Sequence, residues 1–222
     1  MPSLPLSEKH RRDLVELTGL AQRDLARIWR EFDSAFTARD GLRDVLPRLM
    51  EVYGSAAATL AADWYDELRD TLTVKGRFRA IPAELPGNDR TDALARWAVG
   101  PLFKPEPDFD AALALVSGGL QRIIANADRE TIMGSSVADP RALGWQRVGA
   151  GECKTGFCDM LIGRGAVYTE ATADFASHDN CKCSAVPAFG GHPRPVKPFT
   201  PSQRNISDAD RARVRRWIAA NQ

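Results

Sequence analysis

Two long stretches in the first third of the chain repeat apolar side chains every three or four residues, the spacing of an amphipathic helix. The first follows Ser7, a good N-cap residue, and Gly41 marks the turn at its end. Its apolar positions are Leu14, Leu17, Ala21, Leu25, Ile28, Phe32 and Phe36. The second follows Asp44, has Pro47 in its first turn, and carries Val45, Leu49, Val52, Tyr53, Ala56, Leu60, Trp64 and Leu68. Two such helices joined by a short turn predict an antiparallel hairpin with Trp29 and Trp64 in its core.

After this hairpin the chain alternates between breaks and further helical patterns. Residues 73–90 are rich in Gly, Pro and charge and predict a loop. A short helix that ends near Trp97 and a longer helix over 109–132 follow. Gly118 and Gly119 lie inside the longer helix, where they lower its intrinsic stability and permit close packing or a kink.

Beyond a break at 134–144 the apolar pattern shortens to the length of strands. The segments GWQRV and CSAVPAF and the residues around Tyr168 predict short strands. Cys158 to Ile162 predict one helical turn. This part of the chain therefore differs in kind from the helical part before it.

We predict a mainly α protein in four parts. A helical N-terminal domain, a hairpin or bundle, spans 1–138, and a small α+β domain that binds zinc through Cys and His spans 139–189. A proline-rich linker spans 190–206, because its prolines favour an extended chain that buries little. A terminal helix capped by Ser207 spans 207–222.

Bulk composition is that of an ordinary globular protein, with 44% hydrophobic and 27% charged residues. We expect no membrane association, since no apolar run approaches the ~18 residues of a spanning helix. The charged N-terminus lacks the apolar region of a signal peptide, so a reducing cytosol is expected, where clustered cysteines bind metal more often than they form disulfides. Residues 1–140 hold 18 Lys and Arg against 22 Asp and Glu, and residues 141–222 hold 12 against 7, a mild tilt.

All four cysteines and one of the three histidines fall within 31 residues, in the pattern C-x4-C, nineteen residues, then H-x2-C-x-C. Thiolate and imidazole ligands crowded in this way suit the tetrahedral shell of zinc. The candidate ligands are Cys153, Cys158, His178, Cys181 and Cys183.

Five candidates compete for four places. We expect Cys158, Cys181 and Cys183 to bind, together with either Cys153 or His178. The two cysteines of C-x-C point the same way on an extended strand, so both can be ligands or one can be a buried bystander. A set of reduced, partly buried cysteines without metal is the alternative. Trp145 and Arg147 precede the cluster on a predicted strand, where they pack over the site or simply alternate between core and surface.

A catalytic reading of the same residues pairs a Cys158 thiolate with His178, whose ring Asp179 or Asp174 would orient. Such a pair leaves the other three cysteines unexplained. His10, expected on a solvated helix end, and His192, in the proline-rich linker, are poorly placed for a general base. The chain has no G-x-S-x-G, P-loop or G-x-G-x-x-G motif. We therefore predict no catalytic residue.

A nucleic-acid partner is a third possibility. The C-terminal arginines Arg211, Arg215 and Arg216 are able to contact DNA phosphates, although we favour a solvated helix face as their explanation.

The stretch GWQRVGAGECKTGFCDMLIGRGAVYTEATADFASHDNCKCSAVPAF resembles the C-terminal domain of Mu-type (MuF-like) head morphogenesis proteins, the minor capsid proteins of tailed bacteriophages, and most of all those of actinobacterial phages. The family pattern is a cysteine knuckle, an L-x-G-x-x-Y-like middle and a closing H-x-x-C-x-C. These correspond here to Cys153 and Cys158, to Leu161 through Tyr168, and to His178, Cys181 and Cys183. The knuckle gap is four residues instead of two, and Asp179 replaces the usual proline after the histidine.

The resemblance implies a minor component inside the virion head, made in the host cytoplasm and acting in procapsid assembly. It implies the portal protein, the major capsid protein or a scaffold protein as partners, and for some relatives DNA packaging or ejection. Some relatives carry the label of capsid maturation protease, but no protease constellation is visible in this chain.

Overall fold

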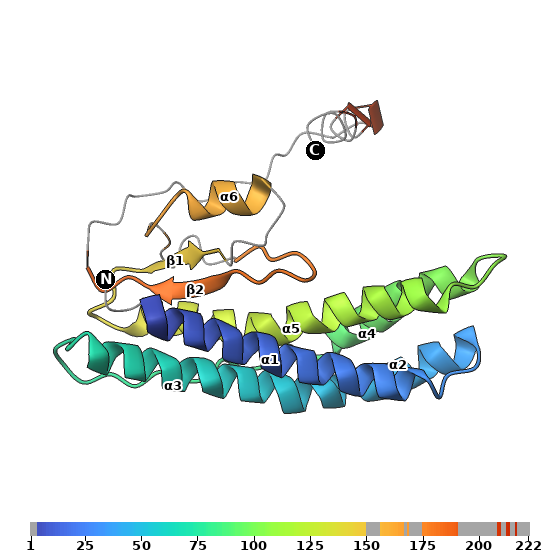
Figure 1. Ribbon diagram of the computed structural model, residues 1–222, viewed down its shortest axis with the longest axis horizontal. Helices are drawn as coiled ribbons and strands as arrows, with labels where there is room; N and C mark the ends of the chain where they lie inside the picture. Colours follow the sequence, from blue (N-terminus) through green and yellow to red (C-terminus); the bar gives the residue numbers. More distant parts are fainter. Residues whose placement is uncertain are drawn as a thin grey trace.

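The computed structural model describes residues 4–149, 156–166, 168, 175–190, 208–209, 212–213 and 216. The protein is mainly helical, with one small sheet, as predicted (Figure 1). In chain order the elements are α1 (Leu4–Trp29), α2 (Ala35–Leu49), the π-helical turn η1 (Met50–Gly54), α3 (Ser55–Thr71), α4 (Asn88–Ala98), the 3-10 turn η2 (Gly100–Phe103), α5 (Phe109–Ala138), β1 (Trp145–Val148), α6 (Gly156–Ile162) and β2 (Ser184–Pro187).

The predicted hairpin forms, but its turn lies elsewhere than expected. Helix α1 runs antiparallel to the continuous rod of α2, η1 and α3 (Figure 1). The turn precedes Ser34, whose Oγ accepts from the Thr37 backbone N–H at 3.2 Å while Thr37 Oγ1 accepts from the Ser34 N–H at 3.1 Å. This reciprocal cap starts α2 ahead of Gly41. Gly41 instead lies inside α2, where a Cβ atom would come within 2.3 Å of the Phe32 ring.

The position of Pro47 also differs from the prediction. It lies in the interior of α2 instead of its first turn, and the π-helical turn η1 begins three residues later. A proline inside a helix removes one backbone donor and disturbs the preceding turn, and a π-helical turn is one way to continue the helix past such a disturbance. The rod therefore continues to Thr71 in α3.

Helix α5 is the central element of the fold and contacts α1, α3, α4 and β2. Asp108 caps it by accepting from the Ala111 N–H at 2.8 Å, and the helix extends to Ala138, six residues beyond the predicted end. The prediction of close packing at its paired glycines is confirmed. A Cβ atom on Gly119 would lie 2.3 Å from Leu94 Cδ1 of α4.

The pair of glycines 119 and 134 on α5 allows a matched test of this packing. We expect Gly119→Ala to destabilise the protein, because overpacking against Leu94 costs about 1–3 kcal/mol, more than the ~0.5–1 kcal/mol gained by removing a helical glycine. Gly134→Ala, with no neighbour within 4 Å, is expected to stabilise by that smaller amount. Urea unfolding of both variants measures the difference, and equal effects would contradict the close contact.

The C-terminal part packs on one side of the helices, near the start of α1 (Figure 1). Its strands β1 and β2 pair antiparallel, with Trp145 opposite Pro187 and Val148 opposite Ser184. Tyr168 adds a single bridge to Trp145. The predicted strands in GWQRV and CSAVPAF and the helical turn α6 are thus confirmed, whereas the strand predicted around Tyr168 is described only as this single bridge.

Two buried clusters make up the core. The first joins α1, α2, α4 and α5, and includes Trp29. The second joins α3 and the end of α5 to the sheet, α6 and the cysteines, and includes Trp64. Because the second cluster crosses the predicted boundary at residue 138, the helical and cysteine-rich parts share a core. The division into four domains stays a prediction.

The predicted linker lies outside the described residues except for Gly190. Of the predicted terminal helix, the described residues 208, 209, 212, 213 and 216 are helical. Among the residues that the structure describes, no helix combines the length and apolar character needed to cross a membrane.

Candidate metal centre

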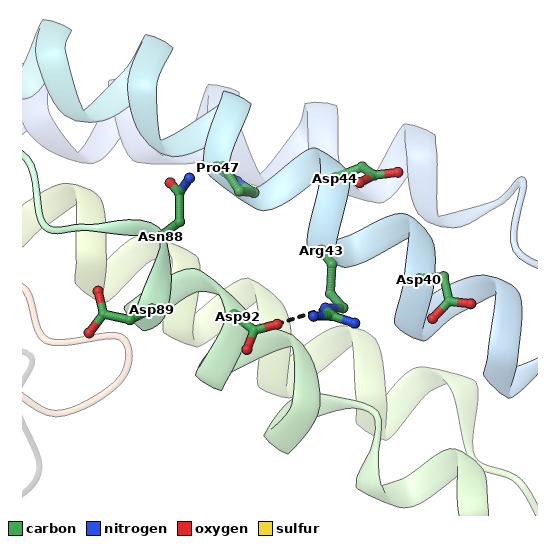
Figure 2. A pocket seen from close by; sticks show the side chains of 7 residues that line it. All are labelled: Asp40, Arg43, Asp44, Pro47, Asn88, Asp89 and Asp92. Carbon is green, nitrogen blue, oxygen red and sulfur yellow. Dashed lines mark hydrogen bonds and ion pairs between the residues drawn. The ribbon is translucent and has the colours of Figure 1, made fainter.

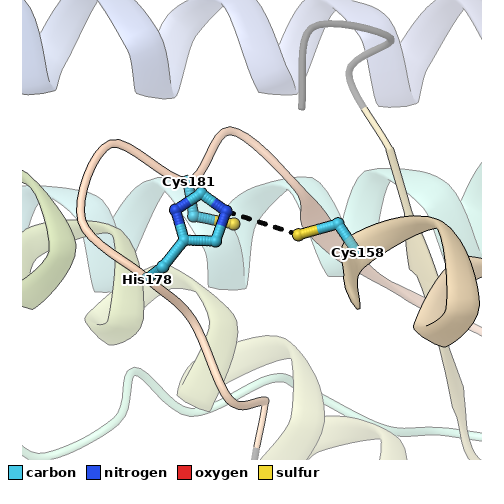
Figure 3. Close-up of side chains that lie close together, drawn as sticks. All are labelled: Cys158, His178 and Cys181. Carbon is cyan, nitrogen blue, oxygen red and sulfur yellow. Dashed lines mark hydrogen bonds between the residues drawn. The ribbon is translucent and has the colours of Figure 1, made fainter. Parts of the chain in front are cut away.

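Three of the five predicted ligands meet between α6 and the loop before β2. Cys158 comes from α6, while His178 and Cys181 come from the loop 175–183, and their ligand atoms all lie within 4.8 Å of one another (Figure 3). Cys158 Sγ is 3.4 Å from His178 Nε2. Bonds of about 2.0–2.3 Å place neighbouring ligands of a tetrahedral zinc ion roughly 3.3–3.8 Å apart. The three side chains can therefore hold a metal ion.

The imidazole of His178 is oriented to bind through Nε2. Its Nδ1 lies 2.7 Å from the Asp179 carbonyl oxygen, and because a carbonyl only accepts, Nδ1 carries the hydrogen. Metal-bound histidines commonly donate their other ring N–H to such a carbonyl. Burial opposes the imidazolium, but the hydrogen bonds with Asp179 and Cys158 outweigh it and raise the pKa of His178.

Backbone conformation in the loop brings His178 and Cys181 to the same side. The Cys181 N–H donates to the His178 carbonyl at 3.2 Å, which closes a tight turn. Asn180 has the left-handed φ of 60° that such a turn requires, and asparagine adopts it more readily than most residues. The turn packs on α5 at Gly118, where a Cβ atom would come within 3.1 Å of the Asn180 amide. Gly118 therefore allows close packing of this turn, as Gly119 does for α4.

Polar side chains of α5 anchor the two cysteines of the C-x-C segment. Arg129, which is 1% exposed, donates to the Cys181 carbonyl at 2.7 Å and to the Cys183 carbonyl at 3.0 and 3.1 Å. Gln121 Nε2 also donates to the Cys181 carbonyl, at 3.2 Å. These bonds provide hydrogen-bond donors for buried backbone carbonyl groups of the loop. They also hold the loop in place against α5.

The start of the loop is anchored to α5 as well. Arg122 forms an ion pair with the Asp179 carboxylate at 2.8 Å, and Ser177 Oγ donates to Asn126 Oδ1 at 2.8 Å. The ligand-bearing loop is therefore held along its length by one helix.

Arg147 of β1 closes the buried side of the cluster. Its Nη2 lies 3.4 Å from Cys158 Sγ and 3.3 Å from Cys181 Sγ. Its guanidinium stacks 4.2 Å from the Phe175 ring, and Phe175 in turn stacks on Trp145 with centroids 5.7 Å apart. Of the two interpretations of Trp145 and Arg147, the structure supports packing over the site, Arg147 directly and Trp145 through Phe175, and not the simpler alternation between core and surface.

The surroundings of Cys181 favour its thiolate. A hydrogen bond from Cys183 and the charges of Arg129 and Arg147 outweigh burial and lower the pKa of Cys181 to about 4. The same hydrogen bond, together with burial, raises the pKa of Cys183. A thiolate is the form of cysteine that binds metal, so Cys181 is prepared for this task.

The other two predicted ligands have different outcomes. Cys183 is 1% exposed and hydrogen-bonds with Cys181 and Arg147, but it is not one of the three whose ligand atoms cluster. Cys153 lies outside the described residues. Which residue completes the shell therefore stays a prediction.

The geometry favours metal binding over the catalytic reading. Cys158 is 0% exposed, so a substrate has no direct approach to its sulfur. The Asp179 carboxylate pairs with Arg122 and leaves only its backbone carbonyl for the imidazole, while Asp174 lies outside the described residues. At that nitrogen the described residues place a backbone carbonyl and not the carboxylate that the catalytic reading expected.

The expectation for His10 was wrong. Its side chain is buried, stacks on Trp64 with centroids 4.5 Å apart, and places Nε2 2.7 Å from Asp128 Oδ1, although the pair is not aligned as a hydrogen bond. Helix α1 packs against α3 and α5, and His10 lies on the face of α1 that contacts Trp64 of α3 and Asp128 of α5. The sequence did contain a sign that His10 is buried, because His10 and Thr18 lie four residues before and after Leu14, on the apolar face of the helix. His192 lies outside the described residues.

A separate hollow of about 560 Å³ lies between α2 and α4 (Figure 2). The Arg43–Asp92 ion pair, 2.7 Å long, crosses it. Its lining is mostly acidic and consists of Asp40, Arg43, Asp44, Pro47, Asn88, Asp89 and Asp92. No buried, unpartnered polar group of the described residues lines this hollow, so we assign it no ligand.

Comparison with known protein families assigns the chain to a family. Residues 1–206 match the family model described as VG15 protein. The chain belongs to the VG15 family. This is a phage-associated family, so the chain is a phage-type protein. Neither the curated proteins nor the solved structures contain a significant match to the VG15 chain.

Proposed function

We propose that this VG15 protein is a minor head protein of a tailed bacteriophage, acts in procapsid assembly at the portal, and contains a structural zinc ion. The observation that carries the proposal is a metal-competent cluster in the very segment that resembles MuF-like head morphogenesis proteins, within a chain that matches a phage family over residues 1–206. Its partners are then the portal, the major capsid protein or a scaffold protein, and its final location is inside the head.

Zinc suits the cluster better than other common metals. Two sulfurs and one imidazole nitrogen are soft donors that can fill three of the four places in the tetrahedral shell of zinc, whereas magnesium and calcium prefer oxygen ligands. The residues also connect separate parts of the chain, since α6 supplies Cys158 and the loop anchored on α5 supplies the other two. A metal ion at this point ties α6 to the helical part.

Two measurements test the two halves of the proposal. Elemental analysis of purified protein should find one zinc ion per chain, and a content well below that would reject the zinc site. A nonsense mutation in the gene of the parent phage should prevent formation of DNA-filled heads, and mass spectrometry should find the chain in purified wild-type virions at low copy. Its absence from both virions and procapsids would reject the head assignment.

A further inference from the structure

The buried guanidinium of Arg147 has no carboxylate partner among the described residues. It is 3% exposed, and it hydrogen-bonds with the Phe175 carbonyl at 2.7 Å, with the sulfurs of Cys158 and Cys181 at 3.4 and 3.3 Å, and with Cys183. A buried cation needs a compensating negative charge. Among the described residues, the neighbours able to supply one are the thiolates of Cys158, Cys181 and Cys183.

Arg129 is a second buried arginine near the same ring, and its hydrogen bonds differ from those of Arg147. Both guanidinium groups lie near the Phe175 ring, at 4.7 Å for Arg129 and 4.2 Å for Arg147. Arg129, however, sends its hydrogen bonds to carbonyl oxygens and to Asn126, and the fully buried Asp128 adjoins it in the chain. Arg129 holds the loop backbone through its carbonyl groups, whereas Arg147 hydrogen-bonds with the sulfur atoms of the cysteines.

We propose that Arg147 is the charge partner of the metal centre, holding the thiolates of Cys158 and Cys181 and balancing a third thiolate in the shell. The inference rests on the proposed metal site. A divalent ion with two thiolates and a neutral imidazole has no net charge, so the added charge of Arg147 leaves the site positive. A third thiolate in the fourth place restores neutrality in an interior where a net charge is costly.

This balance makes the centre a closed one. Three thiolates and one imidazole fill a tetrahedral shell and leave no place for water, which is the arrangement of structural zinc sites. Arg147 is a positioning residue in this scheme, because it touches the ligands and not the metal.

The test compares four variants of the full chain. We expect Arg147→Met and Arg147→Gln, which remove the charge, to weaken zinc binding about 10- to 100-fold, the usual effect of losing a partner of a metal ligand. Arg147→Lys keeps the positive charge but loses the planar set of N–H donors of the guanidinium, and it should bind zinc with intermediate affinity. Arg141→Met, at an exposed arginine a few residues earlier, should bind as the wild type does. Competition with a chromophoric chelator gives the affinities.

Cobalt substitution supplies a readout that a merely structural role would not move. The sulfur-to-cobalt charge-transfer band of the wild type should have the intensity of three Co–S bonds, and two bonds with a bound water would overturn the inference. Equal affinities for wild type, Arg147→Met and Arg147→Gln would also overturn it, as would a lysine variant no tighter than the glutamine variant. If the wild type binds no metal at all, the metal site itself fails, which is a different result.

Discussion

Replacing Cys181 by serine should abolish stoichiometric metal binding and loosen the cysteine-rich part, while the helices stay folded. Cys181 has the lowered thiol pKa and the densest set of anchors, with Gln121 and Arg129 on its carbonyl and Arg147 on its sulfur. Structural zinc contributes about 10–16 kcal/mol of apparent binding free energy in small zinc modules. Losing a ligand therefore removes a large share of what holds α6 in place. Metal content after dialysis and the near-ultraviolet circular dichroism of Trp145 measure the two effects.

Chelation of the wild type provides the matched control. A strong chelator should reproduce the spectrum of Cys181→Ser in the wild type and should leave the variant unchanged. Far-ultraviolet circular dichroism should stay close to that of the wild type in both cases, because the first core cluster of α1, α2, α4 and α5 contains no cysteine. A Cys181→Ser variant that retains one metal ion per chain would contradict the assignment.

The same substitution at the other cysteines identifies the fourth ligand. Cys158→Ser should behave like Cys181→Ser, since both sulfurs belong to the cluster of three. Of Cys153→Ser and Cys183→Ser, one should weaken binding strongly and the other only slightly.

The sequence was a good guide wherever the controlling interactions are local. Amphipathic spacing predicted the helices, and the short apolar segments predicted β1, β2 and the turn of α6. The hairpin turn was misplaced because two local signals competed, a glycine at position 41 and a reciprocal cap between Ser34 and Thr37. The glycine is there for a tertiary reason, the approach of the Phe32 ring, which periodicity does not reveal.

The same distinction applies to the candidate site. The ligand types were visible because they occur within one short segment. The side chains that anchor the Cys181 carbonyl come from 52 and 60 residues away, from Arg129 and Gln121. Nothing in the spacing of α5 distinguishes the buried Arg129 from Arg122, the other arginine of that helix. Which side chains surround a metal ligand is decided by the packing of the fold, and composition does not report it.

Packing also places a buried ion pair where the helical part meets the sheet. Arg69, near the end of α3, donates to both carboxylate oxygens of Asp139, at 2.6 and 3.3 Å, just after α5 ends. Tyr65 Oη donates to the same carboxylate at 3.2 Å, and the side chains of Arg69 and Asp139 are 5% and 0% exposed. The pair fixes the point from which the chain enters β1.

Arg69→Met should therefore destabilise the protein by about 3–5 kcal/mol, because it leaves the Asp139 carboxylate buried without its cation. Arg79→Met is the matched control. Arg79 pairs with Asp66 on the surface with 87% of its side chain exposed, and exposed pairs contribute only about 0–1 kcal/mol. Urea unfolding of the two variants measures the contrast. Adding Asp139→Leu to Arg69→Met should recover part of the lost stability, since no buried charge then remains unpaired. Equal losses of stability in Arg69→Met and Arg79→Met would show that the Arg69–Asp139 pair contributes no more than a surface ion pair.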